Sequence, residues 1–179
     1  MAAIDAQETF SKFDAVFADM GGAAETAAKQ FMDSFDLAEV TAKQMLSATG
    51  DLLTGMGATK DVALDMSLQV NTLAADLASF TNYSGGAEGA SNALTKALLG
   101  ERESVKALGI VIREEDVQNR LAAAGKDKLT GAAMLQAKAE ATLAIAMEQS
   151  KNAIGDYART SDSAANTLKR AGEETKALQ

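Results

Sequence analysis

Residues 136–160 read QAKAEATLAIAMEQSKNAIGDYART, and this stretch decides the fold class. Its 25 residues include no proline and a single glycine, Gly155. The bulky apolar residues are spread among alanines: Leu143, Ile145, Met147, Ile154 and Tyr157. Alanine is the best helix former, because it has no side-chain freedom to lose. The stretch therefore predicts a helix that packs on another element.

The composition of the whole chain predicts the same class. Proline is absent from all 179 residues, although average usage of about 5% would give roughly nine. Alanine fills 38 positions, and aromatic residues make up only 4% of the chain. Proline breaks helix interiors, whereas alanine-rich ridges suit closely packed helices. We therefore expect an all-α fold of antiparallel helical hairpins or a bundle, with long amphipathic helices and no substantial sheet.

The charge and the missing residue types limit the functions that we expect. The net charge of −8 argues against a nucleic-acid site, which needs a basic surface. The lack of cysteine excludes disulfides and thiolate chemistry. The N-terminal sequence MAAIDAQETF has neither the basic nor the apolar region of a signal peptide. The longest uncharged run, Leu77–Ala87, has 11 residues, against about 20 for a membrane span, so we expect no transmembrane segment.

The first expected domain, residues 1–35, has a heptad pattern. Apolar residues recur three and four apart at Phe10, Phe13, Phe17, Met20, Ala24, Ala27, Phe31 and Phe35. This spacing predicts one long helix over Ile4–Ser34 with a weak point at Gly21-Gly22. The alternative is two helices hinged at this glycine pair.

The second expected domain, residues 36–129, has the pattern of a helical-hairpin unit. Asp36 and Glu39 have the spacing of a capping box, which predicts a helix over 37–54 that stops at Gly55–Gly57. Thr59 is expected to cap a helix over 60–81. The buried ridge of that helix would contain Val62, Met66, Val70, Leu73, Leu77 and Phe80. Shorter helices are expected over 87–99, 101–108 and 113–124, with Ile110–Ile112 as an apolar plug.

The third expected domain, residues 130–179, is predicted to hold long helices. Thr130 is expected to cap a helix that runs from Gly131 to about Tyr157. A break at 160–162 is followed by a helix from Ser163 to the end. In that helix Ala164, Leu168, Ala171, Thr175 and Leu178 lie on a heptad pattern. No stop signal follows, so we expect the helices to continue in a longer parent protein.

The residue types present predict no catalytic, cofactor-binding or metal-binding residues. The chain lacks both histidine, the usual general base, and cysteine, the strongest thiol nucleophile. The pairs Glu101/Glu103 and Glu114/Glu115 lie in polar surroundings, which predicts solvated carboxylates without raised pKa values. Asp61, Asp65 and Asp76 lie on a predicted helix and do not form a calcium loop. We therefore expect a protein that is not an enzyme and has no cofactor.

Two blocks of the sequence resemble the tail tape-measure proteins of long-tailed bacteriophages and prophages. The first, residues 73–112, reads LAADLASFTNYSGGAEGASNALTKALLGERESVKALGIVI, and the second, residues 137–166, reads AKAEATLAIAMEQSKNAIGDYARTSDSAAN. With the helix at 55–70, the resemblance extends over about Gln44–Lys169.

The resemblance implies a fragment or short form of a virion structural protein. Such proteins lie in the tail lumen after synthesis in the bacterial cytoplasm, and they template tail-tube assembly and length. The implied partners are tail-tube proteins, tail-tip or baseplate proteins, tail-assembly chaperones and, through its helices, further copies of the chain. The glycine breaks predict that this portion folds into hairpins as a compact head or adaptor. A generic helical scaffold without a phage role and an enzyme are the alternative classes.

Overall fold

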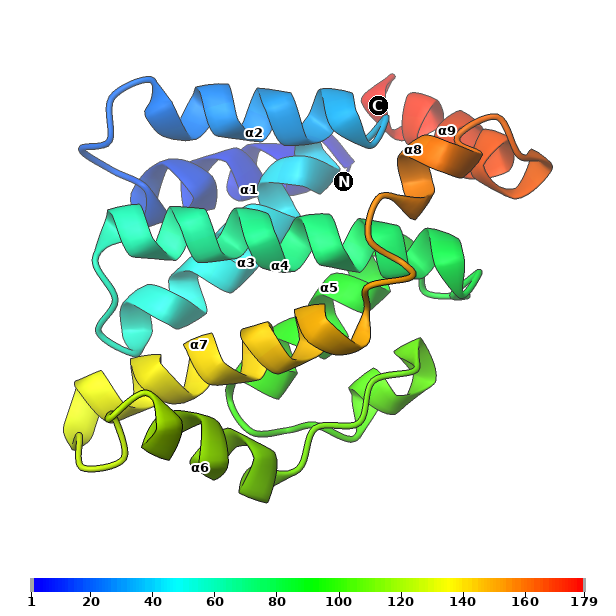
Figure 1. Cartoon of the computed structure of the whole chain (residues 1–179). Coiled ribbons are helices and arrows are strands. Elements are labelled where there is room, and N and C mark those ends of the chain that lie inside the picture. The colour runs from blue at the N-terminus through cyan, green and yellow to red at the C-terminus, as the bar shows by residue number, and fades with distance from the viewer. Residues whose placement is uncertain (1, 179) are drawn as a thin grey trace.

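The computed structural model describes residues 2–178, and every regular element in this range is a helix (Figure 1). The all-α prediction is therefore confirmed, and no strand forms in the described range. The elements are α1 (Ala2–Val16), α2 (Ala23–Ser34), α3 (Glu39–Gly55), α4 (Lys60–Phe80), α5 (Gly86–Leu98), the 3₁₀ helix η1 (Ser104–Leu108), α6 (Glu114–Ala123), α7 (Gly131–Gln149), α8 (Asp156–Thr160) and α9 (Ala164–Ala177).

Helix α4 is the central element, and the other helices are arranged around it (Figure 1). It contacts α3 and α5 along its length and α8 near its C-terminal end. Helices α1 and α2 pack on α3, whereas α6 packs on α7 at the opposite side of the molecule. The last segment, α8 and α9, returns to lie beside the C-terminal half of α4 (Figure 1).

The N-terminal segment corrects one prediction. The single helix expected over 4–34 is wrong, because residues 17–22 form turns and separate α1 from α2. Asp19 and Gly21 adopt positive φ values of 69° and 59° in this turn. The alternative of two hinged helices is therefore the observed one. A single helix of that length would span about 46 Å, whereas the turn lets Phe13 and Phe31 share one core against α3.

A second and larger core lies between α4, α5, η1, α6 and α7. Helix α3 contributes Leu46 to the N-terminal core and Leu53 to this one. The second core contains buried residues on both sides of the predicted boundary at 129/130, from Leu53 to Ala153. The three-domain division remains a prediction, but the buried apolar side chains form two groups joined by α3 and α4.

Several predicted details hold and others do not. Ile110 and Ile112 are buried as the plug predicts, and Gln149 pairs with the backbone of exposed Val111 between them. The capping box is wrong: Asp36 has a φ of 49°, and α3 begins at Glu39 without a side-chain cap. Thr59 and Thr130 occupy the cap positions, but their side chains accept no capping hydrogen bond.

Three further expectations concern the long helices. Helix α7 ends at Gln149, not near Tyr157, because residues 150–155 form a turn. Phe80, predicted on the buried ridge of α4, is half exposed, whereas Met66, Val70, Leu73 and Leu77 of that ridge are buried. None of the helices in the described range is long and apolar enough to serve as a membrane span.

Candidate functional site

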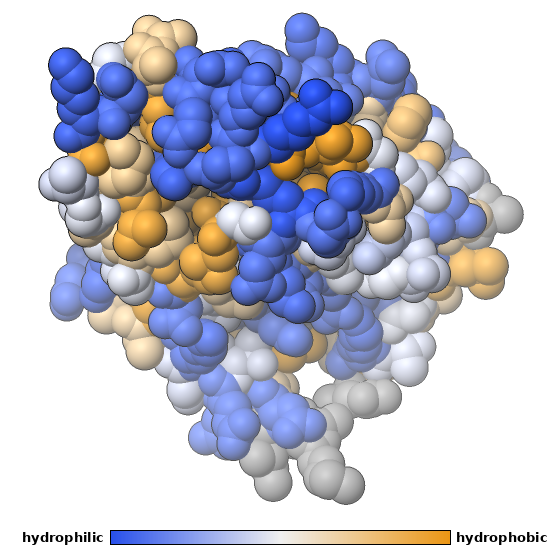
Figure 2. Space-filling view, turned by 90° about the horizontal axis from the view of Figure 1, so that it is seen from below, coloured by the Kyte–Doolittle hydropathy of each residue, from blue (hydrophilic) through white to orange (hydrophobic). Residues whose placement is uncertain are grey.

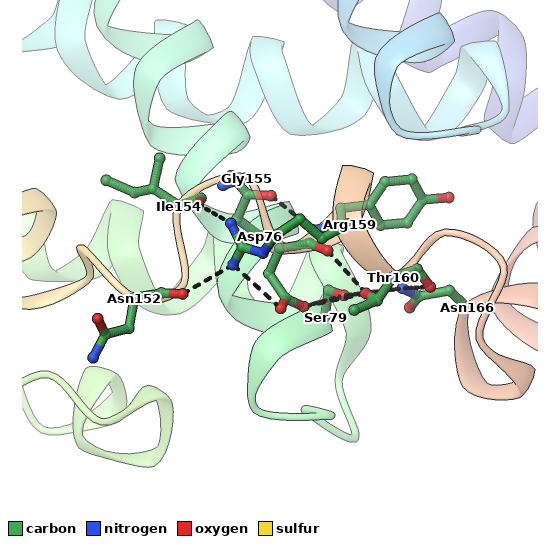
Figure 3. Close-up of polar contacts among 10 residues, drawn as sticks. Asp76, Ser79, Asn152, Ile154, Gly155, Arg159, Thr160 and Asn166 are labelled. Carbon is green, nitrogen blue, oxygen red and sulfur yellow. Dashed lines mark hydrogen bonds and ion pairs between the residues drawn. The ribbon is translucent and has the colours of Figure 1, made fainter.

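The most developed polar site lies where the C-terminal segment meets α4 (Figure 3). Asp76 of α4 is only 3% exposed. Its Oδ2 accepts the Gly155 backbone N–H at 2.8 Å, and its Oδ1 accepts the Tyr157 N–H at 3.1 Å. Gly155 has a φ of 79° and directly precedes α8. Because the first N–H groups of a helix have no partner within it, Asp76 caps α8 from another element.

Three further side chains continue this site along α4 (Figure 3). Ser79 Oγ donates to Asp156 Oδ2 at 2.7 Å, which joins α4 to α8. Asn166 of α9 donates through Nδ2 to Ser79 Oγ at 2.9 Å and to the Thr160 carbonyl at 3.1 Å. Asn166 is 2% exposed. We call Asp76, Ser79, Asp156, Thr160 and Asn166 the polar clamp, because they tie three helices together.

Arg159 stabilises the turn that precedes α8 (Figure 3). Its Nη1 donates to the Ile154 carbonyl at 2.8 Å, and its Nη2 donates to the Asn152 carbonyl at 3.0 Å. Both carbonyls belong to the turn after α7. One guanidinium therefore satisfies two backbone acceptors that the helices leave free, as its forked donors allow.

A second group of contacts ties the same segment to the start of α3. Tyr157 Oη donates to Asp36 Oδ2 at 3.0 Å, and Arg170 lies 3.8 Å from the same carboxylate oxygen. Glu173 Oε2 accepts the Ala38 N–H at 2.9 Å, near the N-terminus of α3. The C-terminal segment is therefore attached by polar contacts both to α4 and to the start of α3.

Burial sets the protonation behaviour of the clamp. It raises the pKa of Asp76, although the Gly155 and Tyr157 N–H groups act in the opposite direction. Burial, together with the hydrogen bond to Asp36, also raises the pKa of Tyr157. A buried carboxylate with a raised pKa can serve as an acid or base when a ligand reaches it. Here both Asp76 oxygens already accept backbone N–H groups, so the arrangement serves to hold helices together.

A cavity of about 270 Å³ lies between the clamp, α9 and the turn before α5. Its walls include Leu37, Ala75 and Ala78. Most charged side chains at its edge pair with one another: Arg170 with Asp36, and Lys176 with Glu88 and Glu173. Lys169 instead donates to the Ala78 carbonyl at 3.3 Å. Thr41 also lines the cavity, and its buried Oγ1 has no hydrogen-bond partner among the described residues. The cavity is therefore apolar inside and largely neutralised at its edge.

Another buried polar group lies where α3, α4 and α5 meet. Asn71 of α4 is fully buried and donates through Nδ2 to the Ser67 carbonyl at 2.8 Å and the Met45 carbonyl at 3.3 Å. Ser91 of α5 donates to Asn71 Oδ1. Thr49 lies within 3.3 Å of the same amide. Since buried polar groups are costly unless paired, this set fixes the register of three helices.

Lys43 joins the first two helices to α3 through a buried charge. Its Nζ lies 2.8 Å from Glu25 and 3.0 Å from Glu39, above the rings of Phe10 and Phe13 at 4.9 and 5.2 Å. Burial acts to lower its pKa, but the two carboxylates outweigh burial and the pKa is raised. Lys43 is therefore a charged side chain that holds α1 and α2 against α3.

The acidic residues singled out from the sequence divide into two kinds. Glu101, Glu103, Glu114 and Glu115 are exposed, as expected for solvated carboxylates. Asp61 and Asp65 are also exposed, but Asp76 is buried with a raised pKa, which the sequence analysis missed. Its position inside the apolar run Leu73–Ala78 was the feature of the sequence that indicated burial. No group of three Asp or Glu side chains in the described part of the chain is arranged to hold a metal ion.

Comparison with known proteins gives no match. No family model, no curated protein and no solved structure is significantly similar to this chain.

Proposed function

We propose that this chain is a structural protein of a long-tailed phage, namely a compact segment of a tail tape-measure protein. The proposal starts from the sequence blocks 73–112 and 137–166, which resemble that family. One structural observation supports treating these blocks as a unit. The first contains the C-terminal part of α4, α5 and η1, and the second contains most of α7, α8 and the start of α9. Both contribute to the second core, and Asp76 and Asn166 join them through the polar clamp.

The shape of the fold supports a head or adaptor role within that class. The longest described helix, α4, has 21 residues, which corresponds to about 32 Å. A single helix of all 179 residues would reach about 270 Å. Length measurement requires an extended element, whereas this chain folds back into a bundle. We therefore assign the measuring role to other parts of a longer parent protein.

The use of the polar residues supports a structural rather than a chemical role. Asp76, Asn71 and Lys43 are buried groups that could otherwise react or bind, and each is engaged by several internal partners. Satisfied buried networks rigidify a fold and specify a single arrangement. Such rigidity suits a protein that presents fixed surfaces to neighbouring subunits.

Co-purification tests the proposal. The chain is co-expressed with any tail-tube and tail-assembly chaperone proteins that its neighbouring genes encode, and an affinity tag on the chain is used for capture. We expect at least one of these proteins to co-purify in a fixed ratio, measured by native mass spectrometry. A helical protein of similar size and charge serves as the control bait. Absence of tail genes from the neighbourhood, or equal capture by the control, would reject the phage assignment and favour a generic helical scaffold.

A further inference from the structure

An apolar groove runs between α4 and α7, which lie side by side at the front of Figure 1. One part, of about 350 Å³, is lined by Val62 and Met66 of α4 and by Leu143 and Met147 of α7. The adjoining part, of about 230 Å³, is also lined by Met147, and its lining includes Leu73 of α4 and Ile154. Because Gln69 and Met147 line both parts, the two parts adjoin, and we describe them together as one groove. It contains no residue of α9.

The groove is apolar and only partly filled by the chain itself. Met66 and Leu143 are buried at its base, Val62 and Met147 are half-buried, and Ile154 is 43% exposed. Exposed apolar area is favourable to cover, at about 25 cal/mol per Å². Elsewhere, exposed apolar residues are dispersed, and Figure 2 shows apolar areas separated by hydrophilic side chains on the side where α6 lies. The groove is therefore a partly exposed apolar surface formed by two helices.

The dimensions of the groove fit a helix. Its α4 wall extends from Val62 to Asp76, about 21 Å or four helical turns. Helices pack by placing the side-chain ridge of one into the groove of another, and an amphipathic helix in an apolar groove is a recurring recognition mode. Met66 and Met147 contribute flexible thioether side chains, which adapt to the shape of a partner.

The charges around the groove define the chemistry of the partner. No Lys or Arg lines either part of it. Asp61 and Asp65 are exposed one turn apart on α4, and neither has a Lys or Arg partner within residues 2–178. On the α7 side, Glu140 already pairs with Lys126 at 2.7 Å. The uncompensated negative charge therefore lies along the α4 edge.

We propose that this groove binds an amphipathic helix of a partner protein, with an apolar stripe facing the groove and Lys or Arg residues facing Asp61 and Asp65. A second copy of the chain is a poor occupant, because each copy has a net charge of −8 and like charges repel. The inference goes beyond the proposed function and applies whether or not the chain belongs to a phage tail.

Labelled peptides provide the test. The probe is an 18-residue synthetic helix with leucines at i, i+3, i+4 and i+7 and lysines along its flanks. A second peptide has glutamates in place of the lysines, and a third has serines in place of the leucines. Binding to the full chain is measured by fluorescence anisotropy. We expect the Leu/Lys peptide to bind at least tenfold more tightly than either of the others.

Charge reversal then locates the binding site. The double variant Asp61→Lys/Asp65→Lys should bind the Leu/Lys peptide at least tenfold more weakly and gain affinity for the Leu/Glu peptide. The matched control Glu115→Lys/Glu174→Lys changes the net charge equally on exposed residues outside the groove, so its affinities should stay within twofold of the unaltered chain. All four substituted positions are exposed, and circular dichroism checks that both variants fold.

Three results would overturn the inference. They are equal binding of the Lys and Glu peptides, equal loss of affinity in both variants, and a concentration-dependent dimer that the groove variant dissociates. Because no tail protein takes part, these results are independent of the co-purification experiment, and either proposal can fail alone.

Discussion

Replacing Gly50 with alanine should destabilise the N-terminal core, although Gly50 lies inside a helix where alanine is normally preferred. Gly50 is buried in α3, and the ring of Phe17 rests against it. A Cβ at this position would lie 2.9 Å from Phe17 Cε1 and 3.0 Å from Val16 Cγ1, and closer still to Phe17 Cζ. Carbon atoms pack best at about 3.5–4.0 Å, so the ring must move.

Two opposing effects set the expected magnitude. Alanine gains about 1 kcal/mol over glycine in a helix interior. Overpacking a core costs about 1–3 kcal/mol. Phe17 is 4% exposed and packs edge-on against Phe13 with ring centroids 5.1 Å apart, so it has little room to move. We therefore expect a net loss of about 1 kcal/mol in the free energy of unfolding for Gly50→Ala.

Urea denaturation of a double-mutant cycle measures this effect. In a Phe17→Leu background the ring is absent, so Gly50→Ala should become neutral or stabilising by up to about 1 kcal/mol. Gly172→Ala is the control, because a Cβ at Gly172 of α9 would meet nothing within 4 Å. This control should be stabilising. If Gly50→Ala stabilises the unaltered chain, or if the cycle shows no coupling, the close approach of Phe17 does not determine this position.

Three other changes have defined expected outcomes. Asp76→Ala leaves the Gly155 and Tyr157 N–H groups without their acceptor, so we expect a loss of about 2–4 kcal/mol by urea denaturation and early proteolytic cleavage around residues 150–163. Asn71→Ala should cost about 2–4 kcal/mol by the same measurement, because it leaves the buried Ser91 hydroxyl without its acceptor and removes the hydrogen bond from Asn71 to α3. Arg102, then Gln118 and Lys138, lower the pKa of Glu114 to about 2 from 4.5. The ionised Glu114 therefore stabilises the fold above pH 4.5, and this contribution is lost as the pH falls towards 2. At pH 7 the free energy of unfolding of Glu114→Gln should be lower than that of the unaltered chain by under about 1 kcal/mol, because the site is exposed. In a pH series of thermal melts, this difference should disappear at the acid end.

Local sequence patterns predicted most helices well. The helix expected over 60–81 is observed as Lys60–Phe80, and the one expected over 113–124 as Glu114–Ala123. The first has strong apolar periodicity, whereas the second buries only Val117 and Leu121. Both end in or near a turn or a glycine, so local propensity and tertiary packing favour the same boundaries. The heptad of residues 10–35 predicted the correct inward face, but not the turn at 17–22. Periodicity continues across a turn when both helices pack on the same neighbour.

The polar clamp could not be predicted because its members are distant in the sequence. Asp76 looks like a solvent-facing residue of an amphipathic helix until Gly155 and Tyr157, about eighty positions away, bring N–H groups to it. A cap supplied from another helix leaves no local motif, in contrast to a capping box. Only the apolar neighbours of Asp76 indicated burial, and they did not indicate the partner.

Helix α9 shows how such contacts can reverse the face that a pattern predicts. Its heptad residues Leu168, Ala171, Thr175 and Leu178 are all exposed, and Leu168 is 75% exposed. The opposite face, with Asn166 and Glu173, makes the hydrogen bonds to α3 and α4. Burying the two leucines of this stripe would gain about 1.5–3 kcal/mol each. Turning α9 over would leave Asn166, Ser79 and the Ala38 N–H without their present partners, at about 1–3 kcal/mol each. The cost of unpaired polar groups therefore offsets the hydrophobic gain, which favours the observed orientation of α9.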